Sequence, residues 1–204
     1  MSSQALSRHD RRKLETRNRI RSAATELFGE RGVEATKISD ICEQADVARQ
    51  TFFNHFPSKA DLLREFFRVG IDFTWAAMDS ACQRGATTRE RLRLYLQDVT
   101  EAAVQVGPMH RDLTAQVIRA GHDSPGEERS SRLSDIFLTF VQRGLKLGDV
   151  TRRHEPQVLA ALVEGAVTTL VGDGAARGDF DVTTRAHQLA DLVADALEKR
   201  PGEK

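Results

Sequence analysis

Three polar side chains of types that suit contact with DNA bases lie close together in the sequence: Arg49, Gln50 and Asn54. An arginine can form two hydrogen bonds with guanine, and a glutamine or an asparagine can form two with adenine. Polar residues also line solvated helix faces that bind nothing, and this is the alternative interpretation. We interpret the cluster as a candidate surface for the direct readout of DNA bases.

The chain before this cluster is predicted to form a short helix and a turn. Thr36 is expected to cap the helix, because its hydroxyl can accept a hydrogen bond from an unpaired backbone N–H. The helix should stop at Asp46, since aspartate tolerates the left-handed conformation that a chain reversal needs. Val47 follows as the buried residue of the turn. The apolar residues of the helix recur at helical spacing and should face a core: Ile38, Ile41, Cys42 and Ala45.

A second short helix is predicted from about Ala48 to Phe56, because the residue before Pro57 is disfavoured in the helical conformation. Phe52 and Phe56 lie four residues apart and can anchor one face, which leaves Phe53 and the polar cluster free to point outward. Two short helices at a steep angle, the second exposing arginine, glutamine and asparagine, are typical of a helix-turn-helix.

The segment from Arg17 to about Phe67 resembles the DNA-binding domain of the tetracycline-repressor (TetR) family of bacterial regulators. The resemblance fixes residue types at many offsets, and it covers about the first third of the chain. The matching residues are Thr36, Ile38, Ile41, Ala45, Val47, Thr51, Phe52, His55, Phe56, Lys59 and Leu62.

The resemblance implies an all-α fold of about nine helices. It implies a three-helix DNA-binding head over residues 1–58, and a helical ligand-binding and dimerisation domain over residues 59–204. The residues that we expect to contact DNA are Thr36, Arg49, Gln50, Thr51, Phe53, Asn54, His55 and Lys59.

Two positions depart from the family's usual pattern. Ala48 stands where a serine commonly follows the turn valine, and Phe53 stands where a tyrosine is common. The family implies that those hydroxyls meet phosphate or cap the helix, and alanine and phenylalanine cannot do this. Some contacts that position the head are therefore expected to be weaker or to come from elsewhere.

The composition is that of a globular protein, with 40% hydrophobic and 29% charged residues among 204. No apolar run reaches the roughly 18 residues of a membrane span. The N-terminus is polar and basic and lacks the apolar core of a signal peptide. We therefore expect a cytoplasmic protein that has no contact with membranes.

Positive charge is concentrated at the N-terminus, although the formal net charge of the chain is +0. Residues 1–21 hold seven basic residues and two acidic ones, or +5. A basic arm before a reading head is expected of a DNA-binding protein. Its arginines could lie along phosphates or enter the minor groove, or the arm could be an exposed stretch that has no defined contact.

Helical periodicity continues through the rest of the chain, and no strand pattern interrupts it. We expect a loop over residues 172–181, which is rich in glycine. Helices are predicted at about 9–31, 59–81, 87–106, 109–120, 124–147, 156–171 and 184–199.

The last two predicted helices carry wide apolar stripes in which small residues are interleaved. Packed against a second copy, they would form a four-helix bundle, and the family dimerises in this way. A dimer would also hold two heads one helical turn of DNA apart, about 34–36 Å. The alternative is that the stripes face the core of their own domain.

Helices over residues 60–147 would then surround a pocket for a small, apolar effector, because such pockets are mostly apolar with a few polar groups. Aromatic residues at helical spacing are more commonly part of a core, which is the alternative for each position. The candidate pocket residues are Trp75, Met78, Tyr95, Met109, His110, Gln116, Arg119, Phe137 and Phe140.

The leading interpretation is a ligand-responsive regulator that acts as a repressor: a homodimer binds a roughly palindromic operator and a small molecule releases it. A non-specific architectural DNA-binding protein is an alternative, although its overall positive charge is missing. A small helical enzyme is a weaker alternative, because the six histidines are scattered and the two cysteines form no CxxC pair. We expect no cofactor and no metal. Cys42 could be a redox switch or an inert core thiol.

Overall fold

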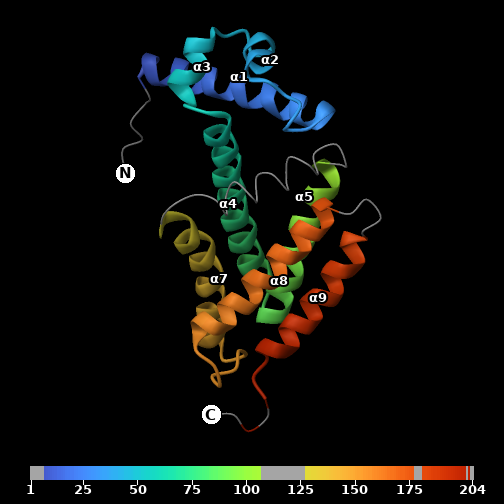
Figure 1. The fold of residues 1–204 in the computed structure, drawn as a ribbon. Helices are drawn as coiled ribbons and strands as arrows, with labels where there is room; N and C mark the ends of the chain where they lie inside the picture. The colour runs from blue at the N-terminus through green and yellow to red at the C-terminus, as the bar shows by residue number, and fades with distance from the viewer. Residues whose placement is uncertain (1–6, 107–126, 177–180, 201, 203–204) are drawn as a thin grey trace.

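The part of the chain described by the computed structural model, residues 7–106, 127–176, 181–200 and 202, is built of helices (Figure 1). Its one β feature is an isolated antiparallel bridge between Val150 and Glu198. This confirms the all-α prediction, while the helix predicted at 109–120 lies outside the described residues. The described helices are α1 (Arg8–Arg31), α2 (Ile38–Gln44), α3 (Arg49–His55), α4 (Lys59–Arg84), α5 (Thr88–Val106), α7 (Glu127–Leu147), α8 (Pro156–Ala176) and α9 (Val182–Leu197).

The buried apolar side chains fall into two separate clusters. The N-terminal cluster joins α1, α2 and α3 with the first two turns of α4. The second cluster joins the rest of α4 with α5, α7, α8 and α9. Figure 1 shows α4 running from the N-terminal helices into the second group, so this one helix belongs to both cores. The domain boundary at residue 58 stays a prediction. The N-terminal cluster contains Ile20, Ala23, Ala24, Leu27, Phe28, Val33, Ile41, Cys42, Ala45, Phe52, Phe56, Leu62 and Leu63.

Local signals set several helix ends as predicted. Gly32 ends α1 with a φ of +81°, a left-handed value that glycine adopts without steric cost. The hydroxyl of Ser58 accepts a hydrogen bond from the backbone N–H of Asp61 and so caps α4. At the start of α5, the hydroxyl of Thr87 accepts from the N–H of Glu90 at 3.2 Å, and the Glu90 carboxylate accepts from the N–H of Thr87 at 3.3 Å. This reciprocal pair is a capping box.

The prediction of a loop over residues 172–181 was wrong for residues 172–176. Helix α8 continues through Gly172 to Ala176, and residues 177–180 lie outside the described part of the chain. A glycine inside a helix costs about 1 kcal/mol relative to alanine. Extending a helix that already exists is nevertheless easy, because the cost of nucleation has been met. Val171 also packs against the second core just before the glycines.

A polar joint closes the base of the second group of helices. The Asp149 carboxylate accepts hydrogen bonds from the backbone N–H and the hydroxyl of Thr88, at 2.6 and 2.7 Å. The adjacent bridge between Val150 and Glu198 ties the end of α9 to the same place. Gly144 of α7 lies against this joint, and a Cβ there would stand 2.4 Å from both Thr88 Oγ1 and Val150 Cγ2.

Replacing Gly144 with alanine should therefore destabilise the protein. Overpacking of this kind costs about 1–3 kcal/mol, because the packed neighbours must shift. The matched control is Gly70→Ala in α4, where an added Cβ meets nothing within 4 Å. The control should gain up to about 1 kcal/mol from helix propensity. Urea unfolding of both variants measures the difference, and equal stabilities would contradict the close approach at Gly144.

Candidate DNA interface

Helix α3 is anchored by aromatic rings on one side and exposes its polar cluster on the other. Phe52 and Phe56 are buried in the N-terminal core, at 0% and 1% exposure, and their ring centroids lie 5.9 Å apart. Arg49, Gln50 and Asn54 are all exposed. The structure thus brings the three predicted base-reading side chains to one solvent-facing surface on a rigidly packed helix.

The amides of Gln50 and Asn54 are joined, because Gln50 Nε2 donates a hydrogen bond to Asn54 Oδ1 at 3.1 Å. The two residues are four apart and are neighbours on the helix surface. The bond leaves one amide hydrogen of Gln50 and the whole NH₂ group of Asn54 as donors, together with the Gln50 carbonyl as an acceptor. The pair thus keeps hydrogen-bonding groups of the kind that can bind the edge of an adenine.

Two further predicted residues of α3 have different surroundings. Phe53 is 37% exposed and packs edge-on against Phe52, with centroids 5.6 Å apart. Thr51 is half-buried. Phe53 therefore presents an apolar ring beside the polar cluster, a surface suited to a thymine methyl or a sugar.

The turn before α3 has the predicted geometry. Asp46 adopts a φ of +51°, the left-handed conformation expected of the residue that reverses the chain. The N–H of Val47 donates to the Cys42 carbonyl at 2.9 Å and closes the turn. Arg19 of α1 donates to the Asp46 carbonyl at 3.3 Å, so α1 supports the turn from outside.

The predicted N-cap of α2 was wrong by one residue. The cap is Lys37, whose backbone N–H donates to the Asp40 carboxylate at 3.3 Å. This hydrogen bond is the largest of the effects that lower the pKa of Asp40. Thr36 is buried, and its hydroxyl donates to the carbonyls of Gly32 at 2.8 Å and Leu27 at 3.2 Å. Its side chain therefore stabilises the end of α1 and does not cap α2. Sequence spacing alone does not distinguish these two roles.

Lys59 also has partners within the head. Its ammonium donates to the carbonyls of Val33 and Thr36, the latter at 2.8 Å, and lies 5.8 Å from the centroid of the Phe28 ring. Lys59 and Thr36 together hold the loop between α1 and α2. Their contacts with DNA stay predictions.

Cys42 lies in the N-terminal core. Burial raises the pKa of its thiol, against a smaller lowering by the charge of Arg49. The thiolate is the form that oxidants attack, so a raised pKa keeps the group unreactive. The surroundings favour the inert core thiol over the redox switch.

His55 ends α3 in a half-buried position, and its Nδ1 has no hydrogen-bond partner among the described residues. Its pKa is lowered, first by burial and then by the positive charges of Arg17 and Lys13. The ring is therefore neutral near pH 7, so a DNA contact through it would use a neutral imidazole.

The lowered pKa of His55 predicts a loss of stability in weak acid. Below about pH 6.5 the unfolded chain binds a proton on this residue, and the folded chain binds it only at lower pH. The free energy of unfolding should therefore decline as the pH falls from about 6.5. In His55→Gln this part of the decline should disappear, while the acid loss below about pH 4 remains, because the pKa of Glu65 and of Asp61 is also lowered. Urea unfolding between pH 4 and 8 tests this, and parallel curves for the two proteins would contradict it.

The basic part of α1 extends beyond the head core. Residues 8–15 are exposed, and the first buried residue of the helix is Ile20. Arg17 donates to the carbonyl of His55 at 3.5 Å, so α1 passes the end of α3 at this level. The N-terminal turns of α1 therefore continue past the end of α3.

The N-terminal helices that form this candidate DNA interface match a known protein family. The model for bacterial regulatory proteins of the tetR family matches residues 20–66. The transcriptional repressor KstR of Mycolicibacterium smegmatis is 30% identical over 189 residues, which span 78% of this chain and 88% of that repressor. The chain belongs to the TetR family of bacterial regulatory proteins. It is thus a relative of helix-turn-helix transcriptional repressors.

Other similar proteins also cover most of this chain, in sequence or in structure. KstR of Mycobacterium tuberculosis is 26% identical over 185 residues, covering 78% of this chain and 82% of that protein. A TetR-family regulator of Pectobacterium atrosepticum superposes with a TM-score of 0.72 at 21% identity, over 96% of this chain and 100% of that one. FadR of Thermus thermophilus, a TetR-family repressor solved in complex with lauroyl-CoA, gives 0.69 at 20% identity, over 91% of this chain and 97% of that one.

The predicted effector-binding residues of this TetR-family chain have different surroundings in the structure. Four are buried in the second core: Met78, Tyr95, Phe137 and Phe140. The rings of Tyr95 and Phe137 meet edge to face, with centroids 6.2 Å apart. Trp75 is 38% exposed on α4. Met109, His110, Gln116 and Arg119 lie outside the described residues. A role in effector binding stays a prediction for the whole set.

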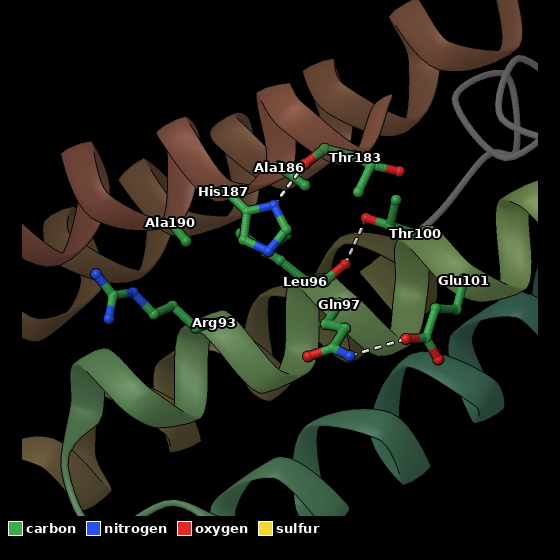
Figure 2. A pocket seen from close by; sticks show the side chains of 9 residues that line it. All are labelled: Arg93, Leu96, Gln97, Thr100, Glu101, Thr183, Ala186, His187 and Ala190. Atoms are coloured by element: carbon green, nitrogen blue, oxygen red, sulfur yellow. Dashed lines mark hydrogen bonds between the residues drawn. The ribbon is translucent and has the colours of Figure 1, made fainter. Parts of the chain in front are cut away.

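A groove of about 410 Å³ lies elsewhere, between α5 and α9 (Figure 2). Two of its polar side chains have partners within the groove: His187 Nδ1 lies 2.9 Å from the Thr183 carbonyl, and Gln97 donates to Glu101 at 2.8 Å. None of its residues was predicted. They repeat every three or four positions along each helix, but the sequence does not reveal that α5 pairs with α9. The lining residues are Arg93, Leu96, Gln97, Thr100, Glu101, Thr183, Ala186, His187 and Ala190.

Among the described helices, none is long and apolar enough to cross a membrane.

Proposed function

We propose that this chain is a repressor that binds a roughly palindromic DNA operator as a homodimer and leaves it when a small apolar molecule binds. The observation that carries the proposal is the exposed surface of Arg49, Gln50 and Asn54 on a helix anchored by two buried phenylalanines. These side chains match the hydrogen-bonding edges of guanine and adenine in the major groove. The exposed basic turns of α1 would supply contacts with phosphate beside it.

The proposed dimer forms through α8 and α9. Helix α8 has one apolar face in its own core, where Leu159, Val163 and Val167 are buried. It has a second, exposed face on which Val158 and Leu162 are 58% and 45% exposed. Neighbouring α9 exposes Leu192 at 67%. An exposed apolar face of this kind commonly marks a contact surface. A second copy of the chain would cover it.

Small residues support a close packing of the two copies. Ala161 and Gly165 lie on the exposed side of α8, about one turn apart. They would let the backbones of two helices approach closely in a four-helix bundle. In a two-fold arrangement the same face meets itself, so one apolar stripe serves both subunits.

The proposed effector binds within the second group of helices and acts through α4. A molecule that favours the state unable to bind DNA by about 1–3 kcal/mol is enough to release the operator. The aromatic residues Tyr95, Phe137 and Phe140 give this region an apolar interior, which suits an apolar effector. Long-chain acyl-CoA is the first class to test, because two proteins of this fold were solved with lauroyl-CoA and with stearoyl-CoA.

The experiment begins with duplexes selected from a random-sequence library by repeated binding to the full-length protein. Fluorescence anisotropy then compares the selected duplex with a scrambled one at two salt concentrations. We expect preferential binding of the selected duplex, two chains per site and an inverted repeat in the selected sequence. Equal and strongly salt-dependent binding to both duplexes would instead support the non-specific architectural protein.

Addition of lauroyl-CoA or stearoyl-CoA to the bound complex tests the effector class, with free coenzyme A as the control. Release by the acylated compounds alone supports an apolar effector. We also propose that the chain acts in the cytoplasm and without catalysis, as its relatives are transcriptional regulators. An effector that is recovered chemically unchanged after release is the expected result.

A further inference from the structure

A buried carboxylate lies where α4 meets the head. Glu65 is 6% exposed, and a carboxylate in such a place is costly unless its oxygens are fully paired. Arg17 of α1 grips it with two parallel contacts, Nε to Oε1 and Nη2 to Oε2, each at 3.0 Å. Arg68 adds a bond at 2.9 Å from the same helix as Glu65, and Arg21 lies 4.0 Å away.

The same Arg17 guanidinium also reaches the end of α3. Its Nη1 donates to the carbonyl of His55, the last residue of α3, at 3.5 Å. Its central carbon lies 4.5 Å from the centroid of the Phe56 ring, a cation–π distance. One side chain from α1 therefore joins the connector helix α4 to the C-terminal end of the recognition helix.

This joint matters because α3 is only seven residues long. Its N-terminal end is held by the turn at Asp46, and its inner face by Phe52 and Phe56. The contact with Arg17 is a polar restraint on the tilt of its C-terminal end. Base readout depends on side chains held within a fraction of an ångström, so a small tilt is enough to lose it.

We infer that Arg17, held in place by Glu65, is a positioning residue that sets the orientation of α3 for sequence-specific binding. The inference rests on the proposed function of α3 as the reading helix. Arg17 acts through α3 and not by touching DNA.

The test uses Glu65→Gln and Arg17→Gln in the full-length protein, with the duplex selected by the wild type and its scrambled counterpart. Each variant should weaken binding of the selected duplex about tenfold, a typical size for a residue that couples two elements. Binding of the scrambled duplex should change less than twofold. The double variant should be no weaker than the single ones, because both remove the same joint. Arg64→Gln is the matched control, since Arg64 is on the same helix and pairs with Asp61 of that helix.

The salt dependence separates positioning from a direct phosphate contact. A lost phosphate contact reduces the slope of log affinity against log salt by about 0.9. We expect an unchanged slope for both variants. A reduced slope for Arg17→Gln, with Glu65→Gln like the wild type, would overturn the inference and assign Arg17 to the DNA backbone.

Arg17→Lys keeps the test decisive if Glu65→Gln unfolds, which a thermal scan would reveal. Lysine keeps the charge but cannot form the two-pronged grip while also reaching His55. It should lose selected-duplex binding at an unchanged salt slope, and wild-type affinity would overturn the inference. If the wild type itself shows no preference for any selected duplex, the proposed function fails, and this outcome is distinct from a failure of Arg17 alone.

Discussion

Replacing Arg49 with alanine should weaken binding of the selected operator by about 10- to 100-fold, because a two-pronged contact with guanine contributes about 1–3 kcal/mol of discrimination. Arg49 is exposed at the first position of α3, next to the turn, where a side chain can reach a base edge. The loss should be largest for the selected duplex and small for a scrambled one. Fluorescence anisotropy with both duplexes measures the two affinities.

The matched control for Arg49→Ala is Arg84→Ala. It removes the same charge from the far end of α4, where Arg84 pairs with Asp98. This control should bind both duplexes as the wild type does. A uniform loss for Arg49→Ala on both duplexes, with a lower salt slope, would instead make Arg49 a phosphate contact, contrary to the assignment to base readout.

The hydrogen bond between Gln50 and Asn54 should couple the effects of replacing either residue. Asn54→Ala removes one reading group and also releases Gln50 from its partner. The effects of Gln50→Ala and Asn54→Ala on operator affinity should therefore not add in the double variant, since neighbouring groups that share a bond act as a unit. Simple additivity would mean that the pair separates when DNA binds.

Sequence reasoning succeeded where short-range chemistry decides the structure. The predicted reading helix ended at Phe56, and the observed α3 ends one residue earlier. The left-handed conformation predicted for Asp46 was also correct. Each depends on a side chain and the backbone within four residues of it, and a single sequence contains that information.

A single sequence does not identify the distant partners of a polar side chain. Lys59 and Thr36 have types that suit phosphate, but they bind backbone carbonyls of the α1–α2 loop. Glu65 looks in sequence like a surface residue of α4, and only the fold brings Arg17 to it across 48 positions. The groove between α5 and α9 was missed because the sequence does not reveal that these two helices pack together. A pattern identifies the inner face of a helix, but it does not identify the helix that packs against it.

Placing charged residues on the proposed dimer face should have the second large effect on operator binding. We expect the double variant Leu162→Glu, Leu192→Glu to be monomeric in sedimentation and to bind the selected operator at least about 100-fold more weakly. The reason is that joining two reading heads raises affinity by about 10²- to 10⁴-fold without any new contact. Four glutamates brought together at a two-fold interface would repel one another and bury unpaired charge.

The stability of the monomer distinguishes a lost interface from a damaged fold. Leu162 and Leu192 are 45% and 67% exposed in a single chain, so their replacement should change its own folding free energy by less than about 0.5 kcal/mol. Leu147→Glu is the control, because this leucine is 49% exposed at the end of α7, outside α8 and α9. It should remain dimeric and bind the operator normally. If the double variant stays dimeric with full affinity, the interface lies elsewhere, and the outer apolar face of α8 and α9 needs a different partner.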